Sequence, residues 1–143
     1  MSEAVVTRPR FHLAFPVQNI EETRTFYVDC LGAKVGREDT RWIDFDFWGH
    51  QISAHLAEDD SPIATNAVDG EQVPCRHFGV ILEMNAWAEL EQRLRQHEVR
   101  FLIEPSVRFK GEPGEQATMF LYDPSGNALE FKAFAADEQV FAR

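Results

Sequence analysis

The chain has 143 residues, of which 44% are hydrophobic, and its formal net charge is −10. This length suits a single domain with its own core, and the acidic balance argues against nucleic acid as a partner. No apolar run is long enough to span a membrane, and residues 1–4 do not start a signal pattern. Two cysteines, Cys30 and Cys75, do not suggest a disulfide scaffold, so we expect a reducing, cytoplasmic setting.

The first half of the chain predicts one strand, one helix and three more strands. Residues 11–16 alternate weakly, which indicates a strand with His12 on one of its sides. Asn19 and Glu22 come close to a capping box, and apolar residues at helical spacing continue to a stop at Gly32. Further strands are expected over residues 33–37, 42–47 and 51–56.

The stretch from residue 57 to residue 74 is acidic and turn-rich, so we interpret it as a connection. After it the same order of elements returns. We expect a strand over 76–82, a helix capped by Asn85, a strand over 101–103 that Pro105 closes, and a charged loop over 108–115. A hairpin of residues 118–122 and 128–134 then surrounds the turn at 123–127.

The two halves are in near register, because His77 follows His12 at almost the interval that separates Asn85 from Asn19. A βαβββ unit of this size cannot bury both faces of its sheet alone. We therefore predict an α+β fold in which two such modules form a curved mixed sheet around a cleft. The expected single domain covers 1–143, with module 1 at about 9–57, a linker at 58–74, module 2 at 75–134 and a tail at 135–143.

Four segments in this order resemble the vicinal oxygen chelate superfamily, which includes glyoxalase I, extradiol dioxygenases, and bleomycin and fosfomycin resistance proteins. They are FHLAFPV (11–17), the FY and LG pairs of 26–32, RHFGV (76–80), and DPSGN with LEFK (123–132). The resemblance covers roughly residues 10–134. It implies a cleft that binds a divalent metal, and it also implies a homodimer.

Carried over from the family, the metal ligands fall on His12, His77 and Glu130. The fourth family position lies on the last strand of module 1, where His55, Ser53 and Gln51 share a face. Two imidazoles and one carboxylate form a facial triad with open positions, which suits Fe(II), although Zn, Mn or Ni are chemically acceptable. Each residue also has an ordinary structural alternative, such as a hydrogen-bonded core histidine or a glutamate that faces water.

Two further residues are candidates for catalytic roles. His55 is either a fourth ligand or an acid/base group, because an imidazole titrates near neutral pH. Tyr122 is either a group that orients a bound oxyanion or a structural hydroxyl. The leading hypothesis is a metal-dependent dioxygenase acting on a small chelating substrate. The alternatives are a glyoxalase-like lyase or isomerase with a non-redox metal, and a metal-free protein that sequesters an antibiotic.

Overall fold

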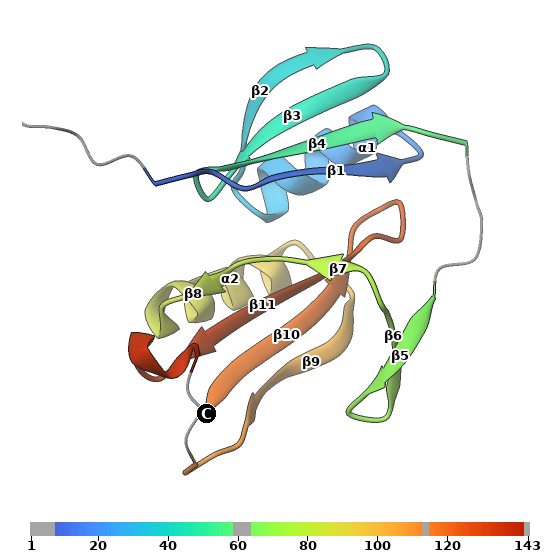
Figure 1. Ribbon diagram of the computed structural model, residues 1–143. Coiled ribbons are helices and arrows are strands. Elements are labelled where there is room, and N and C mark those ends of the chain that lie inside the picture. Colours follow the sequence, from blue (N-terminus) through green and yellow to red (C-terminus); the bar gives the residue numbers. More distant parts are fainter. Residues whose placement is uncertain (1–7, 59–63, 113–114, 142–143) are drawn as a thin grey trace, which may run out of the picture.

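The computed structural model describes residues 8–58, 64–112 and 115–141, which form two modules with the same order of elements (Figure 1). The first module contains β1 (His12–Val17), α1 (Ile20–Thr25), the π-helix η1 (Phe26–Cys30), β2 (Lys34–Asp39), β3 (Trp42–Phe47) and β4 (His50–Leu56). The second contains β7 (His77–Phe78), β8 (Ile81–Leu82), α2 (Met84–Gln96), β9 (Phe101–Arg108), β10 (Gln116–Tyr122) and β11 (Ala128–Phe134). Between them lie β5 (Thr65–Val68) and β6 (Glu71–Pro74), and the short 3-10 helix η2 (Asp137–Gln139) follows β11.

Each module builds a mixed sheet of its own. The strand order is β1-β4-β3-β2 in the first sheet and β7-β11-β10-β9 in the second, where β8 also pairs with β11. In both sheets the opening strand runs parallel to the closing strand, and the remaining pairs are antiparallel. This architecture confirms the predicted α+β fold of two βαβββ modules.

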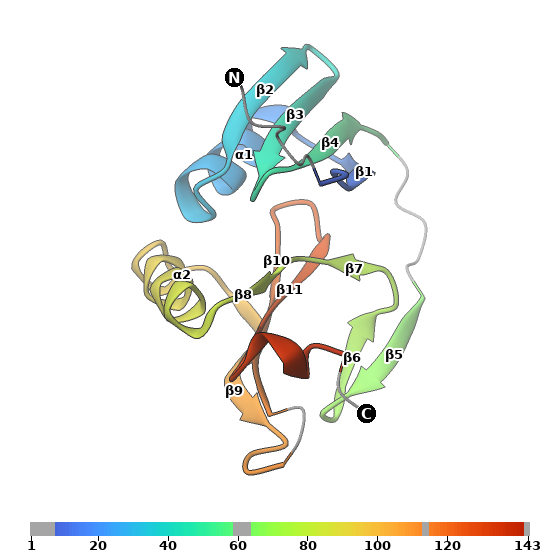
Figure 2. The same ribbon diagram turned by 60° about the vertical axis from the view of Figure 1, so that its left-hand side comes forward.

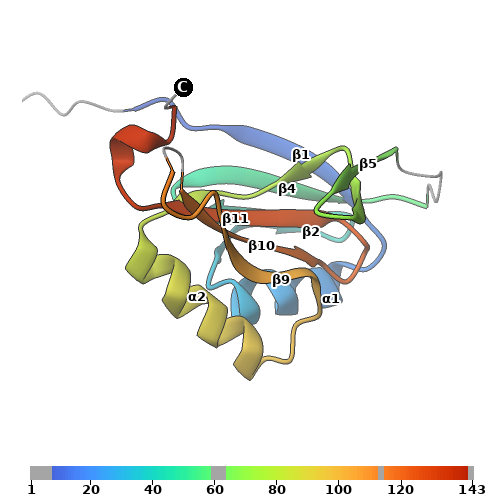
Figure 3. The same cartoon turned by 90° about the horizontal axis from the view of Figure 1, so that it is seen from below.

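The two helices α1 and α2 lie on the same side of the strands (Figure 3). The side chains that alternate toward this side are buried, among them Phe45 of β3 and Phe131 of β11. Buried residues from both modules join in one apolar cluster, so the modules share a core. Among the described residues, neither α1 nor α2 covers the opposite face of the sheets, which we call the helix-free face, and the candidate site lies on it.

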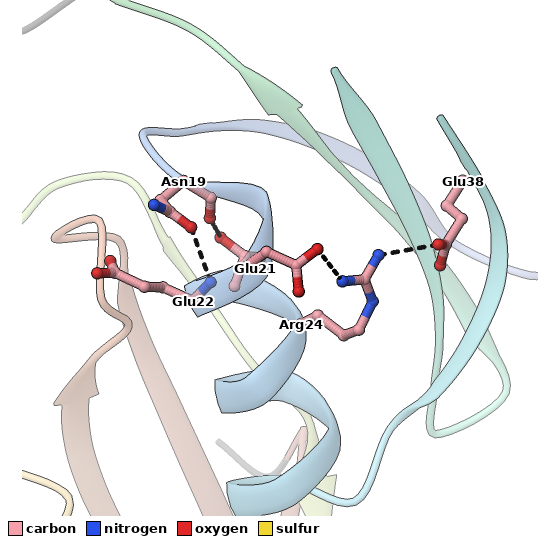
Figure 4. A network of polar contacts seen from close by, with 6 residues as sticks. Asn19, Glu21, Glu22, Arg24 and Glu38 are labelled. Atoms are coloured by element: carbon pink, nitrogen blue, oxygen red, sulfur yellow. Dashed lines mark hydrogen bonds and ion pairs between the residues drawn. The ribbon is translucent and has the colours of Figure 1, made fainter. Parts of the chain in front are cut away.

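The start of α1 is fixed by the cap that the sequence predicts. The Asn19 side-chain oxygen accepts a hydrogen bond from the backbone N–H of Glu22 at 2.9 Å, as Figure 4 shows. Such a cap contributes about 1 kcal/mol. On the other side of the helix, Arg24 binds Glu21 at 2.6 Å and Glu38 of β2 at 2.8 Å, which ties α1 to the edge of the sheet (Figure 4).

The predicted single helix up to Gly32 is in fact two segments. After Thr25 the chain continues as the π-helix η1, and Gly32 then ends the helical stretch with a φ of +76°. This backbone conformation favours glycine. The stop was therefore predicted correctly, whereas the change of helix type was not.

The predicted turn at residues 123–127 joins the two modules. Asp123 is buried, and its carboxylate accepts hydrogen bonds from the Tyr27 hydroxyl at 2.9 Å and from the backbone N–H of Asn127 at 2.8 Å. The Asn127 side chain donates to the backbone carbonyl of Pro16 at 2.9 Å, and the backbone N–H of Gln18 donates to the Ser125 hydroxyl at 2.9 Å. The turn thus connects β10 to β11 and also holds the second module against β1.

The structure corrects two predictions about the second module. Helix α2 begins after Glu83, so Asn85 lies inside the helix and is not its cap. Strand β9 runs through Pro105 and does not end there. Because β9 is an edge strand of its sheet, a residue without an N–H can be accommodated in it.

The connection between the modules is more ordered than its composition suggests. Residues 65–74 form the antiparallel hairpin β5–β6, which stands beside the second sheet (Figure 2). Strand β6 contacts β9, and Asp69 in the hairpin turn lies 3.5 Å from the guanidinium of Arg108 at the end of β9. The predicted linker therefore contains a structural arm, apart from residues 59–63, which lie outside the described part. In that described part no helix is long and apolar enough to cross a membrane.

Candidate functional site

His77 and Glu130 come together at the helix-free face of the second sheet. The parallel pairing of β7 with β11 sets Ala128 opposite His77, and Glu130 follows two residues later on the same side of β11. The Nε2 atom of His77 lies 3.4 Å from Oε1 of Glu130. The Glu130 side chain is only 9% exposed, whereas its neighbours Leu129 and Phe131 face the core, as the alternation predicted.

Hydrogen bonds fix both members of this pair. The Nδ1 atom of His77 lies 2.9 Å from the backbone carbonyl oxygen of Pro74. Because a carbonyl oxygen only accepts, the ring proton must be on Nδ1, and the neutral ring then presents the lone pair of Nε2 toward Glu130. The Thr118 hydroxyl donates to Oε2 of Glu130 at 2.6 Å, which leaves Oε1 as the oxygen that faces His77.

A proton or a cation shared by the two groups would stabilise this arrangement. A neutral Nε2 and an ionised carboxylate oxygen are both acceptors, so their approach is favourable only with a proton or a cation at that point. A protonated His77 would form an ion pair, and a divalent cation would accept both groups as ligands. A histidine that donates its other ring N–H to a carbonyl is the usual geometry of a metal ligand.

Gly79 permits the close approach of β7 and β11. A Cβ atom at this position would lie 1.7 Å from the backbone oxygen of Glu130, which is far inside van der Waals contact. The strand predicted over 76–82 is accordingly divided into β7 and β8 at Gly79 and Val80. A glycine in a strand often marks such a close backbone approach.

His12 lies on the helix-free face of the first sheet, next to Gln51. The parallel pairing of β1 with β4 sets the two residues directly opposite each other. The Nδ1 atom of His12 lies 2.8 Å from Oε1 of Gln51, and both residues are exposed. With the Gln51 amide oxygen oriented toward the ring, as in the structure, Nδ1 of His12 is the donor and Nε2 is again the free nitrogen.

The other two candidates on β4 do not lie beside His12. The Ser53 hydroxyl donates to the carboxylate of Asp44 at 2.6 Å. His55 lies opposite Pro16 of β1, and it is exposed. Because a strand rises about 3.3 Å per residue, His55 is about 13 Å along β4 from Gln51.

Two residues near Glu130 were missed by the sequence analysis, namely Thr118 and Lys132. Thr118 is buried and faces Lys132 across the β10–β11 pair. The Lys132 ammonium lies 3.8 Å from Oε1 of Glu130. The alternation along β11 could have placed Lys132 on the face of Glu130, but the role of Thr118 depends on the register of β10. Tyr122, the other catalytic candidate, ends β10 half-buried on the face that also carries Phe120.

The predicted triad is thus divided between two pairs. His77 and Glu130 share one face of the second sheet, and His12 is paired with Gln51 on the first. Within the described residues of one chain, no group of three or more His, Cys, Asp or Glu side chains is gathered as a metal site. The donor types nevertheless fit a divalent ion, because two imidazoles with free Nε2 atoms and one buried carboxylate are suitable ligands.

Comparisons with known proteins agree with this fold. A sequence model of the Glyoxalase/Bleomycin resistance protein/Dioxygenase superfamily matches residues 11–131. A glyoxalase/bleomycin resistance protein/dioxygenase from Alicyclobacillus acidocaldarius is 33% identical, with a TM-score of 0.78, over 93% of this chain and 96% of that one. The search of curated proteins found no match.

Two more distant structures share the fold alone. A genomically encoded fosfomycin resistance protein from Listeria monocytogenes is 15% identical, with a TM-score of 0.70, over 94% of this chain and 98% of its own. An integron cassette protein from the mobile metagenome of the Halifax Harbour sewage outfall is 22% identical, with a TM-score of 0.67, over 90% of this chain and 100% of its own. The duplicated modules, the length of the match and the similarity to the Alicyclobacillus protein lead to one conclusion: the chain belongs to the glyoxalase/bleomycin resistance protein/dioxygenase superfamily.

Proposed function

We propose that the protein is a metal-dependent enzyme that acts on a small substrate bound through vicinal oxygen atoms. In this proposal His12, His77 and Glu130 hold one divalent ion, and Gln51 orients His12 without being a ligand. The ion supplies a Lewis acid with open positions for the two substrate oxygens. The residues of the chain hold the ligands in one orientation and one protonation state.

The observation that carries the proposal is that both histidines are held in the same way. His12 donates Nδ1–H to the amide oxygen of Gln51, at 2.8 Å, and His77 donates Nδ1–H to the carbonyl of Pro74, at 2.9 Å. The carbonyl of Pro74 fixes the His77 tautomer that leaves Nε2 free for a cation, and the Gln51 amide oxygen favours the same tautomer of His12. The same ring nitrogen thus contacts an oxygen, and the same nitrogen stays free, at the matching positions of the two modules.

We further propose that the two pairs meet in a homodimer, with module 1 of one copy facing module 2 of the other. The support is the exposure of the helix-free face around the first pair, where His12, Ala14, Pro16 and Gln51 are all exposed. The second pair is half-buried and offers only two ligands, whereas a catalytic metal site of this kind uses three from the protein. A twofold axis would complete two identical sites at once.

Subunit exchange between two defective variants tests this arrangement directly. His12→Ala and His77→Ala each remove one ligand, so each homodimer should bind Co²⁺ weakly. In a mixed dimer, one site combines the intact module 1 of the His77→Ala chain with the intact module 2 of the His12→Ala chain. Mixing should therefore restore roughly a quarter of the wild-type sites, because random exchange puts half of the chains into mixed dimers with one intact site each. If verified exchange restores no binding, the shared site is wrong.

For the reaction, we propose ring cleavage of a vicinal diol by dioxygen with Fe(II), because a two-histidine, one-carboxylate set leaves room for both the substrate and dioxygen. The second candidate is a lyase or isomerase with a non-redox metal. Gln51 lies close to the ligand set, and this candidate is favoured if the Gln51 amide also binds the ion.

Oxygen uptake on a panel of catechols supports the dioxygenase. Turnover of a glutathione hemithioacetal without oxygen uptake supports the second. A protein that binds a cationic antibiotic equally well with and without His77 would instead be a sequestering protein.

A further inference from the structure

We propose that Lys132 binds an anionic group of the substrate. The preferred substrates would then be small vicinal-oxygen chelators that carry a carboxylate or another oxyanion next to the chelating atoms. This inference rests on the proposed function, because it takes Glu130 as a metal ligand. It adds the chemical class of the substrate and a residue that selects it.

Lys132 lies next to Glu130, the proposed metal ligand, on the same face of the second sheet. It follows Glu130 by two residues on β11, so both side chains project from the same helix-free face. The Lys132 Nζ atom lies 3.8 Å from Oε1 of Glu130. The lysine side chain is 37% exposed and the glutamate side chain only 9%, so Lys132 is the more accessible of the two from solvent.

The contact between Lys132 and Glu130 competes with a metal. Oxygen Oε2 of Glu130 is occupied by the Thr118 hydroxyl, and Oε1 faces both His77 Nε2 and Lys132 Nζ. A divalent ion at Oε1 would draw on the same oxygen as the ammonium and would repel it. Within the described part of the chain, Glu130 is the only carboxylate in ion-pair contact with Lys132, so an oxyanion of the bound substrate is the group that could replace it.

The charges around this face support the choice of Lys132 as the selecting cation. Arg108 is on β9, which β10 separates from β11, and its guanidinium lies 3.5 Å from the carboxylate of Asp69. The chain as a whole has a net charge of −10, so its overall charge repels anions. A cation beside the metal would therefore attract anionic chelators to this point in particular.

The test uses two chelators that differ by one carboxylate. Wild-type protein is titrated with Co²⁺, and the loaded protein is then titrated with catechol and with 2,3-dihydroxybenzoate, with the visible spectrum of the ion as the readout. The same titrations are made with Lys132→Met, with Lys132→Arg and with Lys34→Met. Lys34→Met is the matched control, because it removes the same charge from exposed strand β2.

Wild-type protein should prefer 2,3-dihydroxybenzoate over catechol, and Lys132→Met should lower this preference by about tenfold, as loss of a charge-assisted contact predicts. The same variant should bind Co²⁺ more tightly, since the competing ammonium is gone. Lys132→Arg should keep the preference, and Lys34→Met should resemble wild type. An unchanged preference, or weaker Co²⁺ binding, in folded Lys132→Met overturns the inference and leaves the proposed function intact. Failure of wild-type protein to bind Co²⁺ overturns the proposed function itself.

Discussion

The two modules repeat one fold, yet they hold their histidines in different surroundings. In module 2 the Glu130 side chain is 9% exposed and receives a hydroxyl hydrogen bond from Thr118, and His77 is fixed by a backbone carbonyl. In module 1 both His12 and Gln51 are exposed, and the histidine is fixed by a side chain that can itself rotate. In the proposed site, module 2 would therefore provide a preorganised half, and module 1 would complete it with a ligand that is held less rigidly.

The comparison predicts that loss of the module 2 carboxylate has the largest effect on metal binding. Glu130→Gln removes the only anionic ligand of the proposed set, so Co²⁺ affinity should fall by more than about 100-fold. His12→Ala should reduce the affinity by a smaller factor, because the preorganised pair remains. Isothermal titration with Co²⁺ measures both, and Glu104→Gln is the control because Glu104 is an exposed carboxylate paired with Arg95. Equal effects of Glu130→Gln and Glu104→Gln would contradict the assignment of Glu130.

The close approach of β7 to β11 should make Gly79 important for both stability and metal binding. Gly79→Ala places a Cβ atom 1.7 Å from the backbone oxygen of Glu130, so the parallel pair must open. We expect a loss of roughly 3 kcal/mol in the free energy of unfolding, together with weaker Co²⁺ binding. Denaturant unfolding measures the first.

Gly36→Ala is the matched control for Gly79→Ala. Gly36 also lies in a strand without a positive φ, but the nearest atoms to an added Cβ there are at 3.5 Å, which is ordinary contact. The control should cost less than about 1 kcal/mol. If the two variants are equally stable, the close approach does not constrain the site.

The partners of the two histidine pairs can be compared directly. Thr118→Val removes the hydroxyl that holds buried Glu130, and we expect about a tenfold loss of Co²⁺ affinity. Gln51→Leu removes the partner of exposed His12, and the loss should be smaller because solvent can replace the amide oxygen. Titration of both variants ranks the two contacts. A larger effect of Gln51→Leu would reverse the proposed roles of the modules, or would make Gln51 a ligand.

A substitution at the module junction should have the smallest effect on metal binding. Its effect on the free energy of unfolding should depend on pH. Burial raises the pKa of Asp123, and hydrogen bonds from Asn127, Tyr27 and Ser125 partly oppose this rise. The folded state therefore binds the Asp123 proton more tightly than the unfolded state. The contribution of this proton to the free energy of unfolding is fully present below the unfolded pKa of about 4, and it is lost as pH rises through the folded pKa.

Tyr27→Phe removes one donor to the charged form of Asp123, so its cost should be larger at pH 7 than at pH 4. At pH 7 we expect about 2 kcal/mol, the range for a hydrogen bond to a charged group. Unfolding curves at the two pH values measure this difference, and Co²⁺ affinity at pH 7 should remain within about twofold of wild type, since Tyr27 does not contact either histidine pair. An equal cost at both pH values would mean that Asp123 does not titrate in this window.

Local signals in the sequence predicted most of the elements but not their pairing. The cap at Asn19, the stop at Gly32 and the turn at 123–127 depend on residues close in sequence, and all three are present. The extension of β9 through Pro105 depends on the position of that strand at the edge of a sheet, which is a property of the whole fold.

The same limit applies to the candidate site. Alternation along β11 was enough to direct Glu130 away from the core. The choice of Gln51 as the neighbour of His12, however, depends on the parallel register of β1 and β4, strands that are separated by a helix and two further strands. The short sequence motifs do not encode that register. The sequence therefore favoured His55 over Ser53 and Gln51 on ligand chemistry, whereas the pairing places Gln51 beside His12.

The metal site shared between two copies is best tested by a crystal structure of the protein loaded with Co²⁺, in which anomalous scattering locates the ion. We expect one ion per site, bonded to His77 Nε2 and Glu130 Oε1 of one copy and to His12 Nε2 of the other. An ion held without His12, or one bonded through the Nδ1 atom of either histidine, would contradict this expectation.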